Sequence, residues 1–248
     1  MSGLDFAQAP PPARPLRWLL SVPAWGMAAG ACLLLSGEVA LSSRWSPHTI
    51  ALVHLFTLGV LGNAMLGSLL QFLPVAAGAP MPLRRSPAWL HASFNLGLAV
   101  FVVSMTSMHR NGLAVASVLL AVPILVFAAA ALPGLLARGA QQVLRSGLAM
   151  AVTALALTAL AGALLVAILR GEAPLPLESI ADAHATIGLL GAVVGLMAAV
   201  ASVTLPMLQG TARVPERWLG GWIALTIVSL AVGVALRMDD LAPFLSIA

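Results

Sequence analysis

Seven apolar stretches, joined by short polar loops, make up most of this chain and limit what it can fold into. They lie at residues 17–37, 49–74, 88–107, 112–134, 146–168, 182–207 and 217–237. A helix of about 20 apolar residues crosses the hydrocarbon core of a bilayer, and each stretch reaches that length. Because a backbone in lipid must satisfy its own polar groups, and the pattern is not that of a β-barrel, the stretches predict helices. We therefore expect an all-α, polytopic bundle of seven transmembrane helices.

The composition agrees with a membrane protein. The chain is 60% hydrophobic and 8% charged, whereas a soluble domain carries about a quarter charged residues. All of its 12 basic residues are arginines, which excludes a lysine Schiff base and with it a retinal-binding protein. No basic run is longer than the pair Arg84–Arg85, so we expect the lipid bilayer and not a nucleic acid as the partner.

The loops are too short to hold a second domain. We expect residues 17–248 to form a single seven-helix domain. Residues 1–16 are rich in proline and alanine and lack the pattern of a signal peptide, so we expect a flexible cytoplasmic tail. The lone Cys32 lies in an apolar stretch and cannot form an internal disulfide.

The distribution of charge predicts the orientation. One side of the membrane receives eight arginines and the other receives four, together with six of the eight acidic residues, Asp239 and Asp240 among them. Because cytoplasmic loops carry an excess of arginine and lysine, we expect the N-terminus in the cytoplasm and the C-terminus in the periplasm of a bacterial inner membrane. Gly26–Gly30 and Gly191–Gly195 are spaced for close helix packing. Asn63 and Asn95 reach similar depth on neighbouring helices, where we expect them to hydrogen-bond to each other as a structural clamp.

Five histidines are the candidate functional residues, and the predicted topology sorts them. His54 and His184 both enter the membrane from the outer side, on the second and sixth helices, whereas His91 lies near the cytoplasmic side. A histidine at membrane depth marks a functional site unless it has a structural partner. Two imidazoles from different helices are a ligand set for haem iron. The alternative is that each histidine simply hydrogen-bonds a carbonyl or reaches the interface.

A second candidate site is weaker. His48, Met105, Met108 and His109 lie near the outer ends of the second and third helices. Thioether and imidazole groups suit Cu(I), so these residues are candidate copper ligands. The alternatives are solvated loop histidines and a methionine that only packs. The sequence lacks the motifs of metalloproteases, P-loop proteins and other soluble enzymes.

The second and sixth helices are related by an internal repeat. When Pro74 is aligned with Pro206, Gly59 falls on Gly191 and Met65 on Met197 without a gap, which relates residues 49–74 to residues 182–207. In this alignment His54 falls on Thr186, and His184 lies two residues earlier.

These two helices carry a family resemblance. HLFTLGVLGNAMLGSLLQFLPVAAG resembles the second helix of small bacterial membrane proteins related to the haem–copper oxidase catalytic subunit, and AHATIGLLGAVVGLMAAVASVTLPMLQ is similar to their later helix with a His-x-His motif. The nitric-oxide-response family NnrS is more loosely similar. The resemblance implies a haem- or copper-binding bundle with its site in the outer half of the membrane, and His54 and His184 are the matching positions.

The departures from that family are informative. Thr186 stands where the family has the second histidine of the His-x-His motif, the chain has no tyrosine, and it has too few histidines for a complete oxidase. A complete oxidase or nitric oxide reductase is therefore excluded. We expect a haem b protein, with copper as a second metal, that serves electron transfer or the handling of nitric oxide or metal. It would act with a redox partner, as a subunit of a respiratory complex, or as a homo-oligomer. The alternative is a metal-free accessory subunit or small permease.

Overall fold

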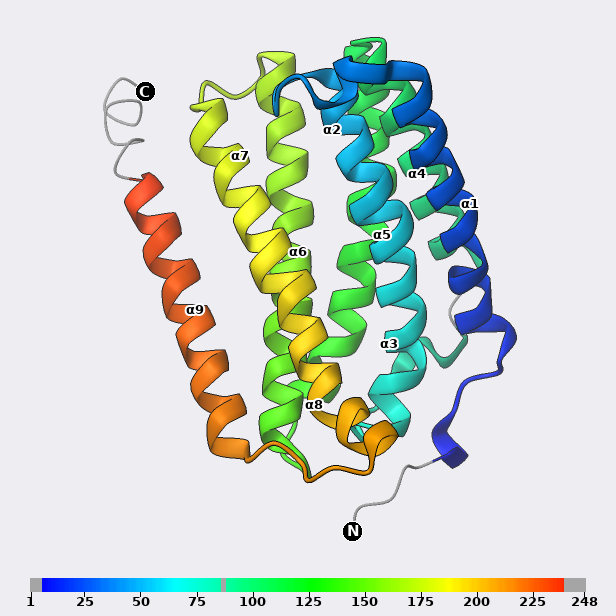
Figure 1. Cartoon of the computed structure of the whole chain (residues 1–248), viewed down its shortest axis with the longest axis vertical. Coiled ribbons are helices and arrows are strands. Elements are labelled where there is room, and N and C mark those ends of the chain that lie inside the picture. The colour runs from blue at the N-terminus through cyan, green and yellow to red at the C-terminus, as the bar shows by residue number, and fades with distance from the viewer. Residues whose placement is uncertain (1–5, 86–87, 239–248) are drawn as a thin grey trace. The chain divides into compact units, whose positions relative to one another are not determined.

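The structure of the chain, a computed structural model, describes residues 6–85 and 88–238. All regular structure in these residues is helical, and seven of the described helices are long and apolar enough to cross a membrane. Each of the seven corresponds to one of the predicted apolar stretches, which confirms an all-α fold with seven helices of membrane-spanning length (Figure 1). Asp239 and Asp240, which entered the prediction of orientation, lie outside the described residues, and that orientation stays a prediction.

Several of the membrane-length helices are built from more than one element. The elements are η1 (Phe6–Gln8), α1 (Ala13–Ser36), η2 (Gly37–Leu41), α2 (Pro47–His54), η3 (Leu55–Gly62), α3 (Asn63–Val75), η4 (Pro82–Arg85), α4 (Ala88–Thr106), α5 (Arg110–Leu136), α6 (Gln142–Arg170), α7 (Leu177–Thr186), η5 (Ile187–Val194), α8 (Gly195–Gln209) and α9 (Glu216–Met238). The elements η1, η2 and η4 are 3-10 helices, whereas η3 and η5 are π-helical. The tail predicted for residues 1–16 includes residues 1–5, which are not described, and α1 begins at Ala13.

The chain divides into two compact units. The N-terminal unit comprises Asp5–Ala76 and Pro82–Ile124, and the C-terminal unit comprises the described parts of Ala77–Met81 and Leu125–Ala248. The long helix α5 starts in the first unit and ends in the second. The single domain over residues 17–248 stays a prediction.

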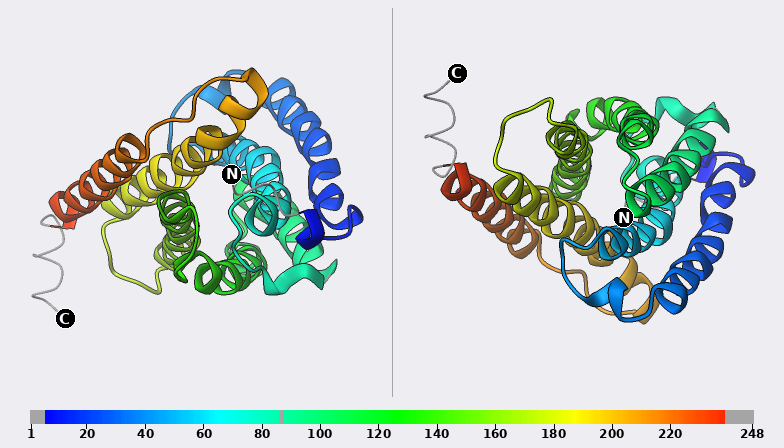
Figure 2. Two further views of the ribbon diagram at one scale, coloured as in Figure 1. Left: turned by 90° about the horizontal axis from the view of Figure 1, so that it is seen from below. Right: turned by 90° about the horizontal axis from the view of Figure 1, so that it is seen from above.

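In the N-terminal unit, α1 packs along η3 and α3, as the end-on views show (Figure 2). Two glycines of the central helix allow this approach. A Cβ on Gly59 would lie 2.7 Å from Trp25 Cβ, and a Cβ on Gly67 would lie 2.8 Å from Trp18 Cβ. The buried side chain of Phe94 on α4 lies close to the other side of this helix, 3.0 Å from where a Cβ on Gly62 would be. The two tryptophans therefore pack against a helix surface from which side chains are missing.

In the C-terminal unit, α6 packs along η5 and α8, and α9 packs on α6. A Cβ on Gly191 would lie 2.7 Å from Ala154 Cβ, and a Cβ on Gly195 would lie 3.0 Å from Met150 Cε. The predicted close packing at Gly191–Gly195 is therefore confirmed.

The same prediction for Gly26–Gly30 on α1 is wrong within this chain. A Cβ on Gly30 would have no atom within 4 Å among the described residues, and a Cβ on Gly26 would meet only Val60 Cγ2 at 4.0 Å. The reason is the rotation of α1 about its axis. It presents Trp18 and Trp25 to the central helix, so the glycines that permit close approach belong to that helix and not to α1.

The two central helices share an irregularity. Figure 1 shows α2, η3 and α3 as one continuous helix, and α7, η5 and α8 as another. The π-helical segments η3 and η5 each span 8 residues, and they coincide residue for residue when the chain is shifted by 132. That shift is the one at which Pro74 aligns with Pro206. Both helices therefore change from α to π and back at corresponding places.

Candidate functional site

His54 is the last residue of α2 and directly precedes η3. Its Nδ1 lies 2.7 Å from the carbonyl oxygen of Ile50, one turn earlier in the same helix. Its ring packs against Phe101 of α4, with ring centroids 4.6 Å apart and planes inclined by 41°. A carbonyl oxygen only accepts hydrogen bonds, so Nδ1 carries the proton and Nε2 carries the lone pair of the neutral imidazole.

His184 lies in α7, two residues before that helix ends at Thr186 and three residues before η5 begins at Ile187. Its Nδ1 lies 3.0 Å from the carbonyl oxygen of Thr158 on α6. The ring packs against Gly162, where a Cβ would lie 3.2 Å from His184 Cε1. The hydrogen bond selects the same tautomer as in His54, with the proton on Nδ1 and the lone pair on Nε2.

The two histidines reach this tautomer in different ways. His54 uses a carbonyl of its own helix, whereas His184 uses one from the neighbouring helix and depends on how α6 and α7 pack. Thr158 is itself fixed, because its hydroxyl donates to Ala154 O at 2.7 Å. Each histidine belongs to a different unit, so each is described in the surroundings of its own unit.

The residues of the predicted copper site all lie in the N-terminal unit, in different surroundings. His109 is exposed and caps the start of α5, where its Nδ1 accepts a hydrogen bond from the Gly112 N–H at 3.1 Å. Met105 is buried in α4, Met108 is exposed, and His48 is partly exposed in the first turn of α2. In the described part of the chain, no group of three or more histidine, cysteine or acidic side chains is placed to hold a metal ion. The copper site stays a prediction.

A polar cluster in the N-terminal unit joins three helices. Asn63 and Asn95 exchange two hydrogen bonds of 3.2 Å, which confirms the predicted contact between them. Trp25, which was not predicted to belong to this cluster, donates its indole N–H to Asn95 Oδ1 at 2.6 Å. An indole within an apolar helix requires a hydrogen-bond partner for its N–H. This requirement is the sequence signal from which a polar partner for Trp25 could have been predicted.

The same face of the unit holds His91, near the other end of α4 from Phe101. Its Nε2 is hydrogen-bonded to Ser21 Oγ at 2.8 Å, and its ring meets Trp18 edge-on with centroids 5.1 Å apart. His91 thus ties α4 to α1, consistent with its prediction as a residue apart from the outer histidines.

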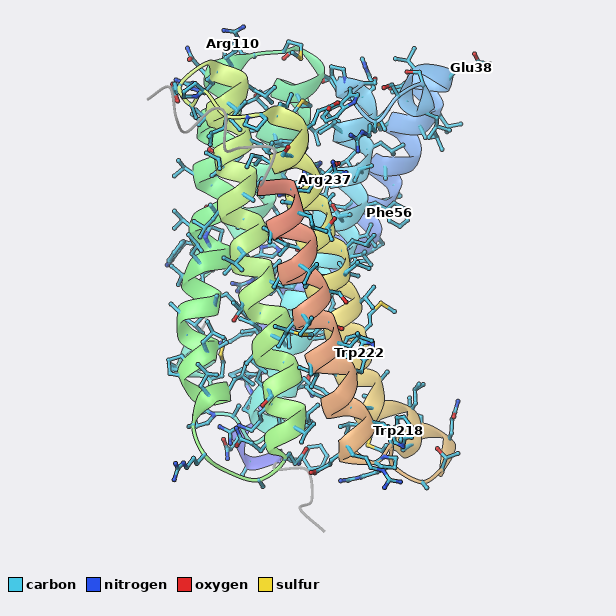
Figure 3. The ribbon with its side chains drawn as sticks, turned by 90° about the vertical axis from the view of Figure 1, so that its left-hand side faces the viewer. Glu38, Phe56, Arg110, Trp218, Trp222 and Arg237 are labelled. Carbon is cyan, nitrogen blue, oxygen red and sulfur yellow. The ribbon has the colours of Figure 1, made fainter. Side chains whose placement is uncertain are left out.

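Two charged contacts mark the C-terminal unit. Arg145 is only 4% exposed, and its guanidinium donates to the carbonyl oxygen of Gly134 near the end of α5. Arg237 lies 3.0 Å from a carboxylate oxygen of Asp182, two residues before His184. Figure 3 shows Arg237 at one end of α9, with Trp218 and Trp222 toward the other end.

Searches against protein-family models, curated proteins and solved structures found no match to this chain. The resemblance to the haem–copper oxidase relatives therefore rests on the residues of the two central helices alone.

Proposed function

We propose that this chain is a haem b-binding membrane protein and that His54 and His184, each in its own unit, are its candidate iron ligands through Nε2. The observation that carries the proposal is the shared tautomer. Both imidazoles donate Nδ1–H to a main-chain carbonyl, at 2.7 Å and 3.0 Å. A metal-binding histidine normally donates its second ring nitrogen to a carbonyl or carboxylate, which fixes the ring and raises its basicity. The donor set is therefore one that suits haem iron. The same two bonds are also expected for the metal-free alternative, so the absorption spectrum decides between the two.

The rest of the surroundings supports the same group. The glycines that follow the two histidines are packed by side chains of their own unit, Gly59 by Trp25 and Gly191 by Ala154, whereas Gly162 leaves the space in which the ring of His184 lies. The side chain of Phe56, two residues after His54, is 55% exposed and projects from the helix (Figure 3). A bound b-type haem supplies one-electron redox chemistry. The protein residues hold and orient it and surround it with apolar side chains.

The proposed setting follows from the charge distribution. We propose a bacterial inner-membrane protein with its N-terminus in the cytoplasm and the histidines in the outer half of the bilayer. Its role would be electron transfer, or the handling of nitric oxide or metal, together with a redox partner. Copper, if bound, would be held by His48, Met105 and His109.

An absorption spectrum of the purified protein tests the proposal. After expression with added haem, the oxidised and dithionite-reduced protein should show a Soret band and sharp reduced α and β bands, typical of low-spin, six-coordinate iron. His54→Ala and His184→Ala should each lose these bands while the protein is still made, and the matched control His48→Ala should keep them.

Two other outcomes would overturn the proposal. A wild-type protein without a Soret band after haem supplementation would favour the metal-free accessory subunit or permease. Metal that survives His54→Ala but is lost in His109→Ala would instead identify a copper protein.

A further inference from the structure

The two π-helical segments are the least ordinary feature of the fold. π-helices make up well under 1% of residues in globular proteins, and those that occur often lie at functional sites. Here one segment directly follows His54 and the other directly follows Thr186, its counterpart in the repeat. Each i→i−5 ring encloses one residue more than the i→i−4 ring of an α-helix. If the segment changed from π to α bonding, a side chain just before it would therefore point in a different direction relative to the helix after it.

Asn63 holds the π register in the N-terminal unit. Its N–H reaches five residues back to Leu58 O, the bond with which the segment ends. Where the backbone bonding changes from i→i−5 to i→i−4, the backbone N–H groups pass over one carbonyl, that of Gly59. The side-chain amide of Asn63 donates to this carbonyl oxygen at 2.9 Å. The side chain is 0% exposed, so water does not compete for this bond.

The position of Asn63 is itself fixed by α1 and α4. Asn95 is bonded to Asn63 in both directions, and its Nδ2 also donates to His91 O at 2.8 Å. The indole of Trp25 donates to the same Asn95 oxygen and packs on Gly59. The end of η3 is therefore connected to both neighbouring helices.

Among the described residues of the C-terminal unit, no side-chain hydrogen bond of this kind is seen at the end of the π segment. Its π segment ends at Gly195, whose N–H is shared between Ala192 O, three residues back, and Leu190 O, five residues back, as the Asn63 N–H is shared between Val60 O and Leu58 O. Gly195 is the counterpart of Asn63 at a shift of 132, but it has no side chain to donate to the carbonyl of Gly191. The same backbone irregularity is thus clamped in one unit and not in the other.

We propose that Asn63 is a positioning residue for His54, because it keeps η3 in the π register, and that η5 is the segment able to change register. His54 is then held in one direction, whereas the segment next to His184 adjusts. The consequence for iron coordination rests on the proposed function, but the positioning of His54 by Asn63 does not.

Four variants separate the contributions. Asn63→Ala removes both the bond to Gly59 O and the pair with Asn95. Asn63→Ser keeps a hydroxyl able to donate four residues back, as Thr57 does to Val53 O in this chain at 2.9 Å, but loses the pair with Asn95. Gly195→Asn installs the clamp in the other unit, where the nearest obstacle is the flexible end of Met150. The control is Ser93→Ala, which removes a bond of similar length from α4 to Leu119 O on α5.

The first measurement is amide hydrogen exchange of the purified protein. Asn63→Ala should raise exchange across residues 59–64 by about tenfold or more, because it removes three hydrogen bonds of a buried side chain, one to Gly59 O and two shared with Asn95. Asn63→Ser should recover most of the protection, Ser93→Ala should leave it unchanged, and Gly195→Asn should slow exchange in residues 191–196. Unchanged exchange in Asn63→Ala would overturn the clamp. Wild-type exchange as slow in η5 as in η3 would overturn the difference between the units.

The second measurement is the ¹⁵N NMR spectrum of the histidine side chains, which number five in this chain. Asn63→Ala should shift the ring nitrogens of His54 and spare those of His109, and Asn63→Ser should restore them. If exchange rises while the His54 signals stay in place, Asn63 has only a structural role and the positioning proposal is wrong. Both measurements need no haem, so a protein that binds none would end the proposed function without deciding this inference.

Discussion

Gly59→Ala tests the packing of the N-terminal unit, because the structure gives both its cost and a matched reference. The new Cβ would lie 2.7 Å from Trp25 Cβ and 2.9 Å from Trp25 Cγ, where ordinary contact begins at 3.4 Å. Trp25 Cβ is attached to the backbone, so no rotamer change relieves the overlap and α1 must move. Overpacking of this kind costs about 1–3 kcal/mol. The higher helix propensity of alanine returns up to about 1 kcal/mol.

Gly30→Ala is the reference, because it makes the same substitution in the same unit with no atom within 4 Å of the new Cβ. Both variants replace a helical glycine by alanine, Gly59 in the π segment and Gly30 in α1, so their difference in unfolding free energy measures chiefly the steric cost. We expect Gly59→Ala to be less stable than Gly30→Ala by about 1–3 kcal/mol. Reversible denaturation by SDS in mixed micelles measures both. Equal stabilities, or a more stable Gly59→Ala, would refute the packing of α1 on η3.

Three further predictions use single residues. His109→Ala should lower stability by about 1 kcal/mol through loss of the α5 cap, and His109→Asp should restore it in the same denaturation assay. Arg145→Ala should cost about 2 kcal/mol or more because a buried stem is deleted, whereas Arg145→Met should be tolerated, since Nε of this arginine is buried without a partner among the described residues. In a Cys32→Ser background, an impermeant maleimide added to spheroplasts should label Ser43→Cys but not Gly139→Cys; the reverse would invert the predicted orientation.

The seven spans could be predicted because apolar length is a direct physical requirement of the bilayer. The ends were less accurate. Helix α1 begins at Ala13 and α7 at Leu177, whereas the apolar stretches begin at residues 17 and 182. Hydropathy reports where the chain enters hydrocarbon, and the helical hydrogen bonds continue beyond that point into the interface.

The contact between Asn63 and Asn95 was predictable for a similar reason. Two amides at similar depth on antiparallel neighbours each need a partner where water is absent. A carbonyl partner for His54 and His184 was the alternative prediction, but the particular carbonyl was not predictable, because every residue possesses one. The π segments also could not be predicted from the sequence, since an added residue in the hydrogen-bonded ring leaves the composition and the apolar pattern of the stretch unchanged.

The difference between the two π segments bears on how such a repeat acquires different roles. The backbone shape of the central helix is common to both units, because η3 and η5 coincide at a shift of 132 residues. This shape depends on glycines such as Gly59 and Gly191, which bring a neighbouring helix close. Polar side chains are not common to both. Asn63 has Gly195 as its counterpart, and His54 has Thr186. Because hydrogen bonds in lipid are directional and glycine contacts are not, the polar residues decide which segment is held and which can adjust, on a scaffold that both units share.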